Sequence, residues 1–439
     1  MFEGVATRLP VTFHGEGSGE GELTWGQREI WHTMRRTGRT LNIGGVLALP
    51  PSATVAEYAG LLEYLVGRHQ ALRTRFVLDA GGDPVRQVVD ATGTVHLDLV
   101  DGPTEAEAEA LRGRYEFTPF DLEREYPIRM GVVVRDGAPS HLVVQYSHLA
   151  VDGFGIDAIV RDLAHRGAEH PPPPSGLAPL ELAARQHSPA GRKQSAKSIR
   201  YWRSLLADVP PARLPGSDDP RTPRFRELVC RSPALHLALR AIAARTRAET
   251  GHALLAAYAV ALARVTGIRP VVAQVLVSNR FRPDCADAVC HLTQPGLVVV
   301  DPGPGAAPVP FDELVARVWK SATAAYLHGY YDPAEHRAML DGLAAERGAT
   351  IDLSCFVNDR RGPSAPGPAP DGAQARAALP RTTVRWEREL PTYDGRLYLQ
   401  VDAAEDAVQL GIWADTHAIA PAAVERFARE LEAVAVTAA

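Results

Sequence analysis

Residues 141–153 read HLVVQYSHLAVDG, and this stretch decides how the first part of the chain is interpreted. Side chains alternate between the two faces of a strand, so a strand here places His148 on the same face as Tyr146 and the apolar residues before it. Asp152 and Gly153 then form a turn, and the residues that follow, FGIDAIVRDLAH, carry apolar side chains at helical spacing. The stretch predicts a strand, a turn and a helix, with an imidazole where the strand ends.

Two interpretations of His148 remain open at this point. A tightly held imidazole at the end of a strand stays near neutral and accepts a proton, which is the behaviour of a catalytic base. In that case Asp152 braces the turn against a cation, and Gly153 leaves room for a substrate to approach the backbone. Alternatively, His148 is a core histidine, because a histidine four residues before Asp-Gly also arises by chance.

The surrounding sequence alternates helices and strands. Thr24 is a plausible N-cap for a helix over 24–36, and Thr54 with Glu57 forms a capping box before another. A polar helix is predicted at about 103–116, and a hairpin is predicted to turn at Asp136-Gly137. The further predicted strands of this part are 42–50, 73–78, 84–90 and 95–101.

Residues 164–176, AHRGAEHPPPPSG, interrupt the pattern. Four consecutive prolines fit neither a helix interior nor a central strand, so we place a boundary there, between a lobe of residues 1–170 and a lobe of residues 171–439. In the second lobe, the Pro/Gly-rich residues 361–380 have the length of a lid or crossover loop. The other elements predicted there are helices near 177–206, 234–248, 250–266, 311–328 and 421–434, and strands at 270–279, 296–301 and 350–360.

Composition narrows the class of protein. The 439 residues carry a net charge of −5, without the basic excess of a nucleic-acid-binding protein. The apolar runs are too short to cross a bilayer, and the N-terminus lacks the pattern of a secretory signal. The four cysteines show no metal-type or redox-type spacing. We therefore expect a cytoplasmic protein, monomeric, with no nucleic-acid or membrane partner and no metal site.

Several segments, in order along the chain, resemble the condensation domains of nonribosomal peptide synthetases. LTWGQREIWHTM (23–34) is similar to the family's first signature, and RHQALRTRF (68–76) matches its second almost residue for residue. YSHLAVDG (146–153) resembles its His-His-x-x-x-Asp-Gly motif. VSNRFRPDCADAVCHLTQPGLVVV (277–300) resembles its Gly-Arg-x-x-Pro-Glu segment and the strand that follows. The resemblance covers essentially the whole chain.

The sequence also departs from the family's pattern. Ser147 stands in place of the first motif histidine, to which the family usually gives a structural part, whereas the second histidine, linked to catalysis, is kept as His148. Related acyltransferases need only His-x-x-x-Asp-Gly, so Ser147 leaves an enzymatic reading possible. Cys290 and Gln294 stand where glycine and asparagine are usual.

The resemblance implies a mixed α/β fold of two chloramphenicol-acetyltransferase-like lobes, arranged as a V-shaped pseudo-dimer with a tunnel between them. It implies that Arg280 pairs with Asp152 across the lobes. By role, the expected site residues are His148, Asp152 and Gly153 for catalysis, Arg280 as a structural brace, and Tyr146, Ser147 and Phe154 along the substrate tunnel.

The function that the resemblance implies is condensation of an acyl thioester, carried on the phosphopantetheine of a carrier protein, with an amine or hydroxyl acceptor. No adenylation, thiolation or thioesterase segment follows Ala439, so we expect a free-standing enzyme of natural-product biosynthesis without a cofactor of its own. One alternative is an acyltransferase that uses coenzyme A or a carrier donor and a free small-molecule acceptor. Another is a catalytically silent module that recruits carrier proteins or tailoring enzymes.

Two further histidines are expected to have no part in chemistry. His291 lies beside Cys290, but no other ligand stands at usable spacing for a metal. His336 lies one helical turn after Asp332, which predicts a surface pair.

Overall fold

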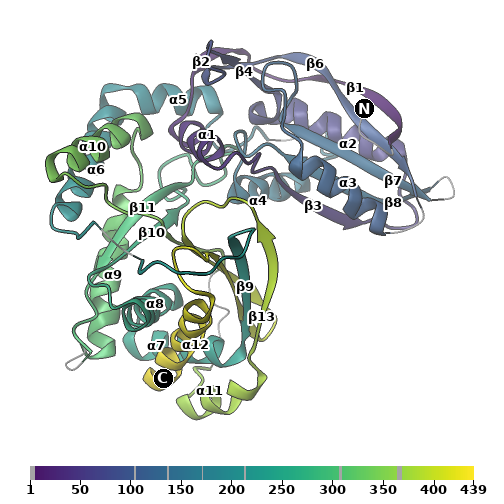
Figure 1. Ribbon diagram of the computed structural model, residues 1–439. Coiled ribbons are helices and arrows are strands. Elements are labelled where there is room, and N and C mark those ends of the chain that lie inside the picture. Colours follow the sequence, from purple (N-terminus) through teal and green to yellow (C-terminus); the bar gives the residue numbers. More distant parts are fainter. Residues whose placement is uncertain are drawn as a thin grey trace. The chain divides into compact units, whose positions relative to one another are not determined.

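The computed structural model describes residues 5–102, 105–135, 138–170, 172–211, 214–305, 309–362 and 368–439 (Figure 1). The chain forms two compact units. The first unit comprises residues 1–194 together with 278–293, and the second comprises 195–277 together with 294–439. The proline-rich segment on which the lobe boundary was placed thus belongs to the first unit.

The first unit is built on a five-stranded sheet that is antiparallel except where β6 lies parallel to β7. The expected hairpin corresponds to the antiparallel pair β7–β8, although its turn residues Asp136 and Gly137 lie outside the described residues. In sheet order the strands are β1 (Val5–His14), β6 (Thr92–Asp101), β7 (Ile128–Arg135), β8 (Ala138–Tyr146) and β3 (Ile43–Ala48). A smaller sheet consists of β2 (Gly19–Glu22), β5 (Pro84–Val89) and β4 (Thr74–Leu78).

Helices α2 (Val55–Arg68) and α3 (Glu105–Phe117) cover opposite faces of the larger sheet. On β8, Leu142 packs in the core cluster of α2, whereas its neighbour Val143 packs in that of α3. Because adjacent strand residues face opposite sides, the two helices lie on different faces. Tyr146 shares the α2 face with Leu142, as the sequence predicts.

The helix starts predicted from capping residues are confirmed. Thr24 caps α1 (Trp25–Thr37) and Thr54 caps α2, each in a reciprocal capping box. The other helical elements of this part of the chain are η1 (Gln70–Arg73), α4 (Gly153–Asp162), η2 (Leu163–His165), α5 (Pro179–His187) and α6 (Pro189–Leu206), the last of which continues into the second unit.

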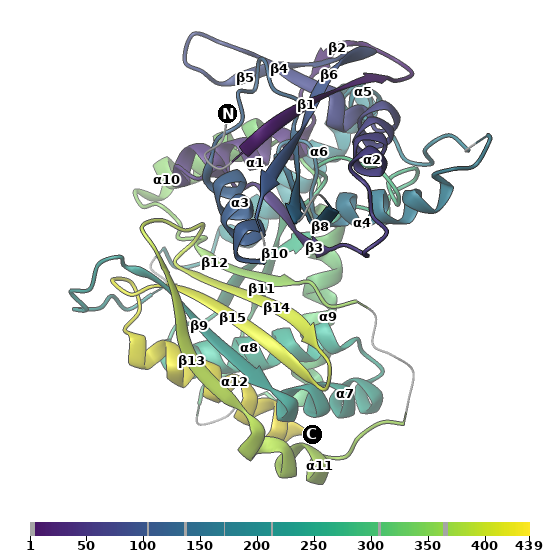
Figure 2. The ribbon, with the colours of Figure 1, turned by 90° about the vertical axis from the view of Figure 1, so that its right-hand side faces the viewer.

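The second unit is built on a seven-stranded mixed sheet. Figure 2 shows α8 (Thr250–Thr266) and α12 (Pro421–Ala438) along one face of it, and their apolar side chains form one core cluster with the strands. In sheet order the strands are β11 (Gln294–Val300), β10 (Val271–Val277), β12 (Cys355–Asp359), β14 (Leu397–Ala404), β15 (Ala407–Asp415), β9 (Phe225–Ser232) and β13 (Thr383–Leu390). The remaining helical elements are α7 (Pro233–Thr246), α9 (Phe311–His328), α10 (Pro333–Arg347), α11 (Gly372–Ala378) and η3 (Leu379–Arg381).

Two expectations for the second unit need correction. The segment 361–380 is not wholly a loop, because Asp371 caps the short helix α11 within it; residues 363–367 lie outside the described part. The predicted surface pair of Asp332 and His336 is also wrong. Asp332 is the N-cap of α10, and His336 is buried against the rings of Trp202 and Tyr331. Within the described ranges, no helix is long and apolar enough to cross a membrane.

Candidate functional site

His148 and Asp152 lie in the six residues between β8 and α4, and Gly153 is the first residue of α4; all three belong to the first unit. β8 ends at Tyr146, so His148 lies in the turn beyond the strand and not on the strand itself. The turn is held by backbone hydrogen bonds in which Ser147 donates to Pro127 at 3.0 Å and Ala150 donates to Ser147 at 3.0 Å. The half-buried His148 ring is therefore presented by a fixed backbone.

The hydrogen bond of His148 defines its neutral tautomer. Nδ1 lies 2.8 Å from the carbonyl oxygen of Val151. A carbonyl only accepts, so Nδ1 carries the hydrogen and donates it, and Nε2 keeps its lone pair. Among the described residues, none forms a hydrogen bond with Nε2. In this state Nε2 is the atom through which His148 accepts a proton.

Burial keeps this imidazole uncharged. Desolvation lowers the pKa of His148 below its usual value, and the Val151 carbonyl and the negative charge of Asp152 oppose that shift only in part. At neutral pH the ring is thus ready to accept a proton.

Asp152 is the N-cap of α4. Its Oδ1 accepts a hydrogen bond from the backbone N–H of Gly155 at 2.8 Å, which satisfies one of the free donors of the first helical turn. The Asp-Gly pair is therefore the start of the helix and not a separate turn before it. Because the helix begins at Gly153, the cap fixes where the His148 turn ends.

The same carboxylate holds the segment 278–293. Arg280 donates to both of its oxygens, Nη2 to Oδ1 at 2.8 Å and Nη1 to Oδ2 at 3.0 Å. Oδ2 also accepts from the backbone N–H groups of Leu292 and Thr293 and from Thr293 Oγ1 at 2.8 Å. The resemblance implied a pair that crosses between lobes, but residues 278–293 belong to the first unit, so the ion pair is internal to that unit.

This network keeps Asp152 ionised. Burial alone would raise the pKa of the carboxyl, but the positive charge of Arg280 and the donated hydrogen bonds outweigh burial and hold the pKa well below its usual range. Both oxygens are engaged by the protein, so the carboxylate ties the start of α4 to Arg280 and to the backbone of Leu292 and Thr293.

His291 is the residue at this site that sequence reasoning missed. Its ring lies edge-to-face against that of His148, with centroids 4.8 Å apart and planes at 75°. Its Nε2 lies 3.2 Å from the carbonyl oxygen of Thr293 and therefore carries the hydrogen. No spacing rule signals this pair, because the backbone of residues 290–293 is held by Asp152, which lies 140 positions before Leu292 in the sequence.

The other residues that the sequence predicted for the site differ in how exposed their side chains are. Tyr146 is buried in the core of the first unit, and Ser147 is buried with its hydroxyl oxygen unpartnered among the described residues. Phe154 is 47% exposed, and the guanidinium of Arg280 lies 5.6 Å from its ring centroid. Gly153 is exposed, and a Cβ added there would meet nothing within 4 Å, so the backbone is open to approach.

Two glycines that were not among the predicted site residues allow helices α4 and α1 to pack closely against the segment 290–293. A Cβ on Gly155 would lie 2.4 Å from Val151 Cγ2 and 3.2 Å from the Cys290 carbonyl oxygen. A Cβ on Gly26, in α1, would lie 2.0 Å from the carbonyl oxygen of His291. Real Cβ atoms do not adopt the distances of 2.4 Å and 2.0 Å, and 3.2 Å is closer than most of their contacts, so α4 and α1 both approach the 290–293 backbone closely at a glycine.

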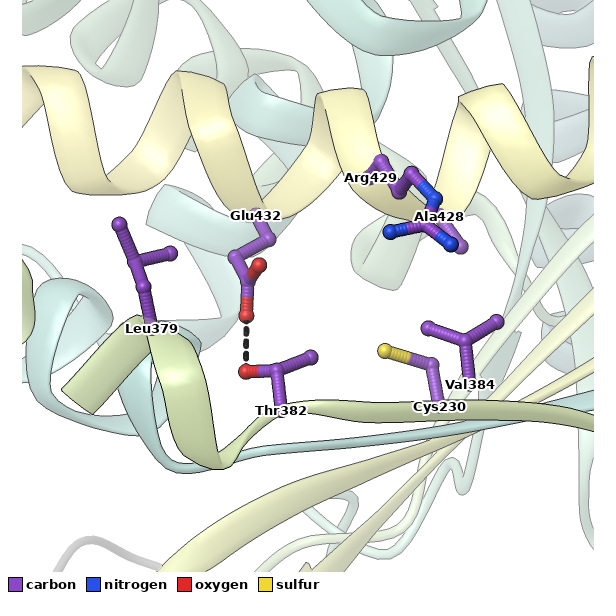
Figure 3. Close-up of a pocket in the computed structure, with 7 residues that line it drawn as sticks. All are labelled: Cys230, Leu379, Thr382, Val384, Ala428, Arg429 and Glu432. Carbon is purple, nitrogen blue, oxygen red and sulfur yellow. Dashed lines mark hydrogen bonds between the residues drawn. The ribbon is translucent and has the colours of Figure 1, made fainter.

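A separate pocket of about 150 Å³ lies in the second unit between α12 and strands β9 and β13 (Figure 3). Glu432 faces it, but its Oε1 already accepts from Ser232 and Thr382, both at 2.5 Å. Burial raises the pKa of the Cys230 thiol to about 12, which leaves it a poor nucleophile. The polar groups here tie α12 to the sheet. Within the described residues, no cluster of three or more His, Cys, Asp or Glu side chains is arranged to hold a metal.

The fold is that of solved condensation-domain structures, which have two chloramphenicol-acetyltransferase-like lobes. A family model described as the condensation domain matches residues 20–340. The chain belongs to the condensation-domain family.

Named relatives are similar to the chain in sequence or in fold. The phosphinothricin tripeptide synthetase PhsC of Streptomyces viridochromogenes is 27% identical over 328 residues, which make up 71% of this chain and 30% of the synthetase. The chain therefore spans less than a third of that relative. The condensation domain of chain release from the enacyloxin polyketide synthase superposes with a TM-score of 0.71 at 20% identity, over 96% of this chain and 82% of that one. The X-domain in complex with OxyB from teicoplanin biosynthesis superposes with a TM-score of 0.70 at 21% sequence identity, over 94% of this chain and 93% of that one.

Proposed function

We propose that this protein is a free-standing condensation enzyme that joins an acyl group, delivered as a phosphopantetheine thioester on a carrier protein, to an amine or hydroxyl acceptor. The observation that carries the proposal is the state of His148. Its Nδ1–H is committed to the Val151 carbonyl, and its Nε2 lone pair is left without a protein partner among the described residues. Membership of the condensation family supports the choice of reaction.

In the proposed reaction the acceptor's lone pair attacks the thioester carbonyl carbon. A C–N or C–O bond forms, and the C–S bond breaks. His148 Nε2 takes the proton that the acceptor loses and returns it to the leaving thiolate, so that charge and atoms balance. General base catalysis of this kind contributes about 10²–10⁴-fold. A thioester is activated enough to react without a metal or a nucleotide.

The surrounding residues act on His148 and not on the reactants. The paired charges of Asp152 and Arg280 fix the start of α4 and the 290–293 backbone, and hence both sides of the turn. Gly153 leaves an open backbone beside this turn. We propose that one of the two substrates approaches there.

The test uses a carrier protein loaded with a panel of acyl-phosphopantetheine thioesters, each offered with amine and hydroxyl acceptors. Mass spectrometry follows the loss of acyl group from the carrier and the gain of product. We expect product with the unaltered protein and at least a 100-fold loss with His148→Ala. The same acyl groups on coenzyme A form a second arm, and turnover there alone would assign the alternative acyltransferase that takes a free acceptor.

A matched control separates loss of the base from loss of the fold. His141 lies on the same strand, β8, five residues before its end, and its Nδ1 lies 3.2 Å from the neighbouring Ser140 hydroxyl. We expect His141→Ala to keep full activity. A His148→Ala variant that retains full activity would remove the base assignment.

A silent recruiting module is the second candidate, and two observations favour it. Ser147 replaces the first motif histidine, and the structural relatives include an X-domain in complex with OxyB from teicoplanin biosynthesis. In the same assay, a silent module would bind the loaded carrier without transferring any acyl group in the panel.

A further inference from the structure

The His148 ring has a buried imidazole beside it that the proposed reaction does not use. The two rings meet edge to face at 4.8 Å between centroids, within the range of favourable ring pairs. His148 donates through Nδ1 to Val151, and His291 donates through Nε2 to Thr293. The contact therefore joins two neutral rings held in opposite tautomers, each fixed by its own carbonyl.

His291 is held more firmly than His148. Its side chain is buried, and the residues on both sides of it are anchored. Arg280 Nη2 donates to the Cys290 carbonyl oxygen at 3.2 Å, and Asp152 accepts from the backbone of Leu292 at 3.0 Å. The close approach of Gly26 blocks retreat of the His291 carbonyl toward α1. The His291 ring is thus a fixed surface, and the half-buried His148 ring rests on it.

The environment also keeps His291 uncharged. Burial lowers its pKa to about 3, and the guanidinium of Arg280, together with any proton taken up by His148, acts in the same direction, whereas Asp152 and the Thr293 carbonyl oppose the shift. These are the groups that face the ring from the turn, the helix start and the 278–293 segment. A neutral ring packs against His148 without adding a charge that would compete for the proton.

We propose that His291 is a positioning residue for His148. Its ring holds the His148 imidazole in the orientation in which Nδ1 donates to Val151 and Nε2 is presented to the acceptor. The inference rests on the proposed function only in one respect, namely that Nε2 is the atom that accepts a proton from the acceptor. The contact that positions the His148 ring is present in the protein without substrate. An imidazole that is only packed, with no hold on His148, would leave the His148 ring unchanged when removed.

The experiment is long-range proton–nitrogen NMR of histidine-labelled protein, with signals assigned by single substitutions and followed with pH. We expect the unaltered protein to show the Nδ1–H tautomer for His148 and the Nε2–H tautomer for His291. In His291→Ala, His148 should show averaged tautomers, and its titration midpoint should rise toward 6.5 as water reaches the ring. An unchanged tautomer and midpoint would overturn the proposal.

A second variant guards against loss of folding. His291→Phe keeps an aromatic surface and is expected to restore the single tautomer of His148; a folded Phe variant that behaves like His291→Ala contradicts positioning by the ring. His336→Phe is the matched control, because His336 is also a buried imidazole but lies in the second unit. It should leave the His148 signals unchanged.

Activity gives an independent readout. With an active substrate pair, His291→Ala should lower kcat by about 10–100-fold with little change in KM, because misplaced reacting groups cost rate and not binding. Absence of turnover in every protein would count against the proposed function, while the NMR result would still decide the positioning role.

Discussion

At the scale of single residues, the Asp152 carboxylate carries the most connections of any group at the site. It caps a helix, pairs with a guanidinium and accepts from two backbone N–H groups and a hydroxyl. Burying a charge is costly unless it is paired and hydrogen-bonded, and here it is both. The resemblance of the sequence to the family was enough to predict the Asp152–Arg280 pair. It did not reveal that the pair also holds His291.

The first prediction concerns this ion pair. Asp152→Asn or Arg280→Met should each lower the free energy of unfolding by about 3–5 kcal/mol, because either change leaves an unpaired buried group. The double variant should lose less than the sum, with a coupling of at least about 1 kcal/mol in a double-mutant cycle measured by urea unfolding.

The control for that cycle is a surface pair between the same two segments. Arg161 Nη2 lies 2.8 Å from Asp287 Oδ1, with both side chains about half exposed. Exposed pairs contribute about 0–1 kcal/mol, so its coupling should be smaller. Equal coupling in the two cycles would contradict the brace.

The second prediction concerns Ser147, whose buried hydroxyl has no partner among the described residues. Removing an unsatisfied hydroxyl removes a desolvation cost, so Ser147→Ala should keep or slightly raise the free energy of unfolding. Ser195→Ala is the comparison, because Ser195 Oγ donates to Glu335 at 2.7 Å and accepts from the Asp332 N–H at 2.9 Å. That variant should lose about 1–3 kcal/mol. A comparable loss at Ser147 would show that its hydroxyl is engaged.

At the scale of elements, a helix or strand could be predicted from the sequence when the residues that stabilise it lie close together along the chain. The starts of α1 and α2 were predicted because their capping partners lie three residues apart. Strand β9 was not predicted, because its buried Glu227 is an unfavourable strand residue until Arg388, 161 positions away, pairs with it at 2.6 Å. His148 and its turn could be predicted because the motif residues lie within a few positions of one another. His291 could not, because the residue that holds its backbone, Asp152, lies far away in the sequence.

The third prediction is made at the start of α4, where two glycines two positions apart differ in their surroundings. Gly155→Ala should cost about 1–3 kcal/mol, since its Cβ would press on Val151 and Cys290. Gly153→Ala meets no atom within 4 Å and should leave the unfolding midpoint unchanged. If a substrate approaches this backbone, Gly153→Ala should lower turnover without loss of stability. Full turnover would show that no substrate comes close there.

At the scale of the whole molecule, buried histidines occur in both units. Burial lowers the pKa of His69 to about 4, and that of His291 and of His336 to about 3. In the unfolded chain these rings protonate near pH 6.5. The folded state binds fewer protons than the unfolded state between those values, so stability falls as pH drops below about 6.5.

The fourth prediction follows from this difference. Urea midpoints should be similar at pH 7.5 and 6.5 and fall steeply from 6.5 to 4.5, with an upper bound of about 1.4 kcal/mol per pH unit for each buried ring. Asp152 contributes little in this window, since a carboxyl whose pKa is lowered by folding loses its stabilising effect mainly below about pH 4. His336→Phe should flatten the profile of the second unit. An unchanged midpoint down to pH 4.5 would contradict the assignment of neutral buried rings.

The path of the chain through the two units has a consequence for synthesis. The chain leaves the first unit after Gln194, and residues 278–293 return to it and complete it. On the ribosome, Asp152 therefore emerges 128 residues before Arg280. Until then the carboxylate lacks its cation, and the 290–293 backbone that bears His291 does not yet exist. A gene fragment that stops before codon 278 encodes a first unit without its internal counter-ion, so the order of translation makes this site one of the last parts of that unit to form.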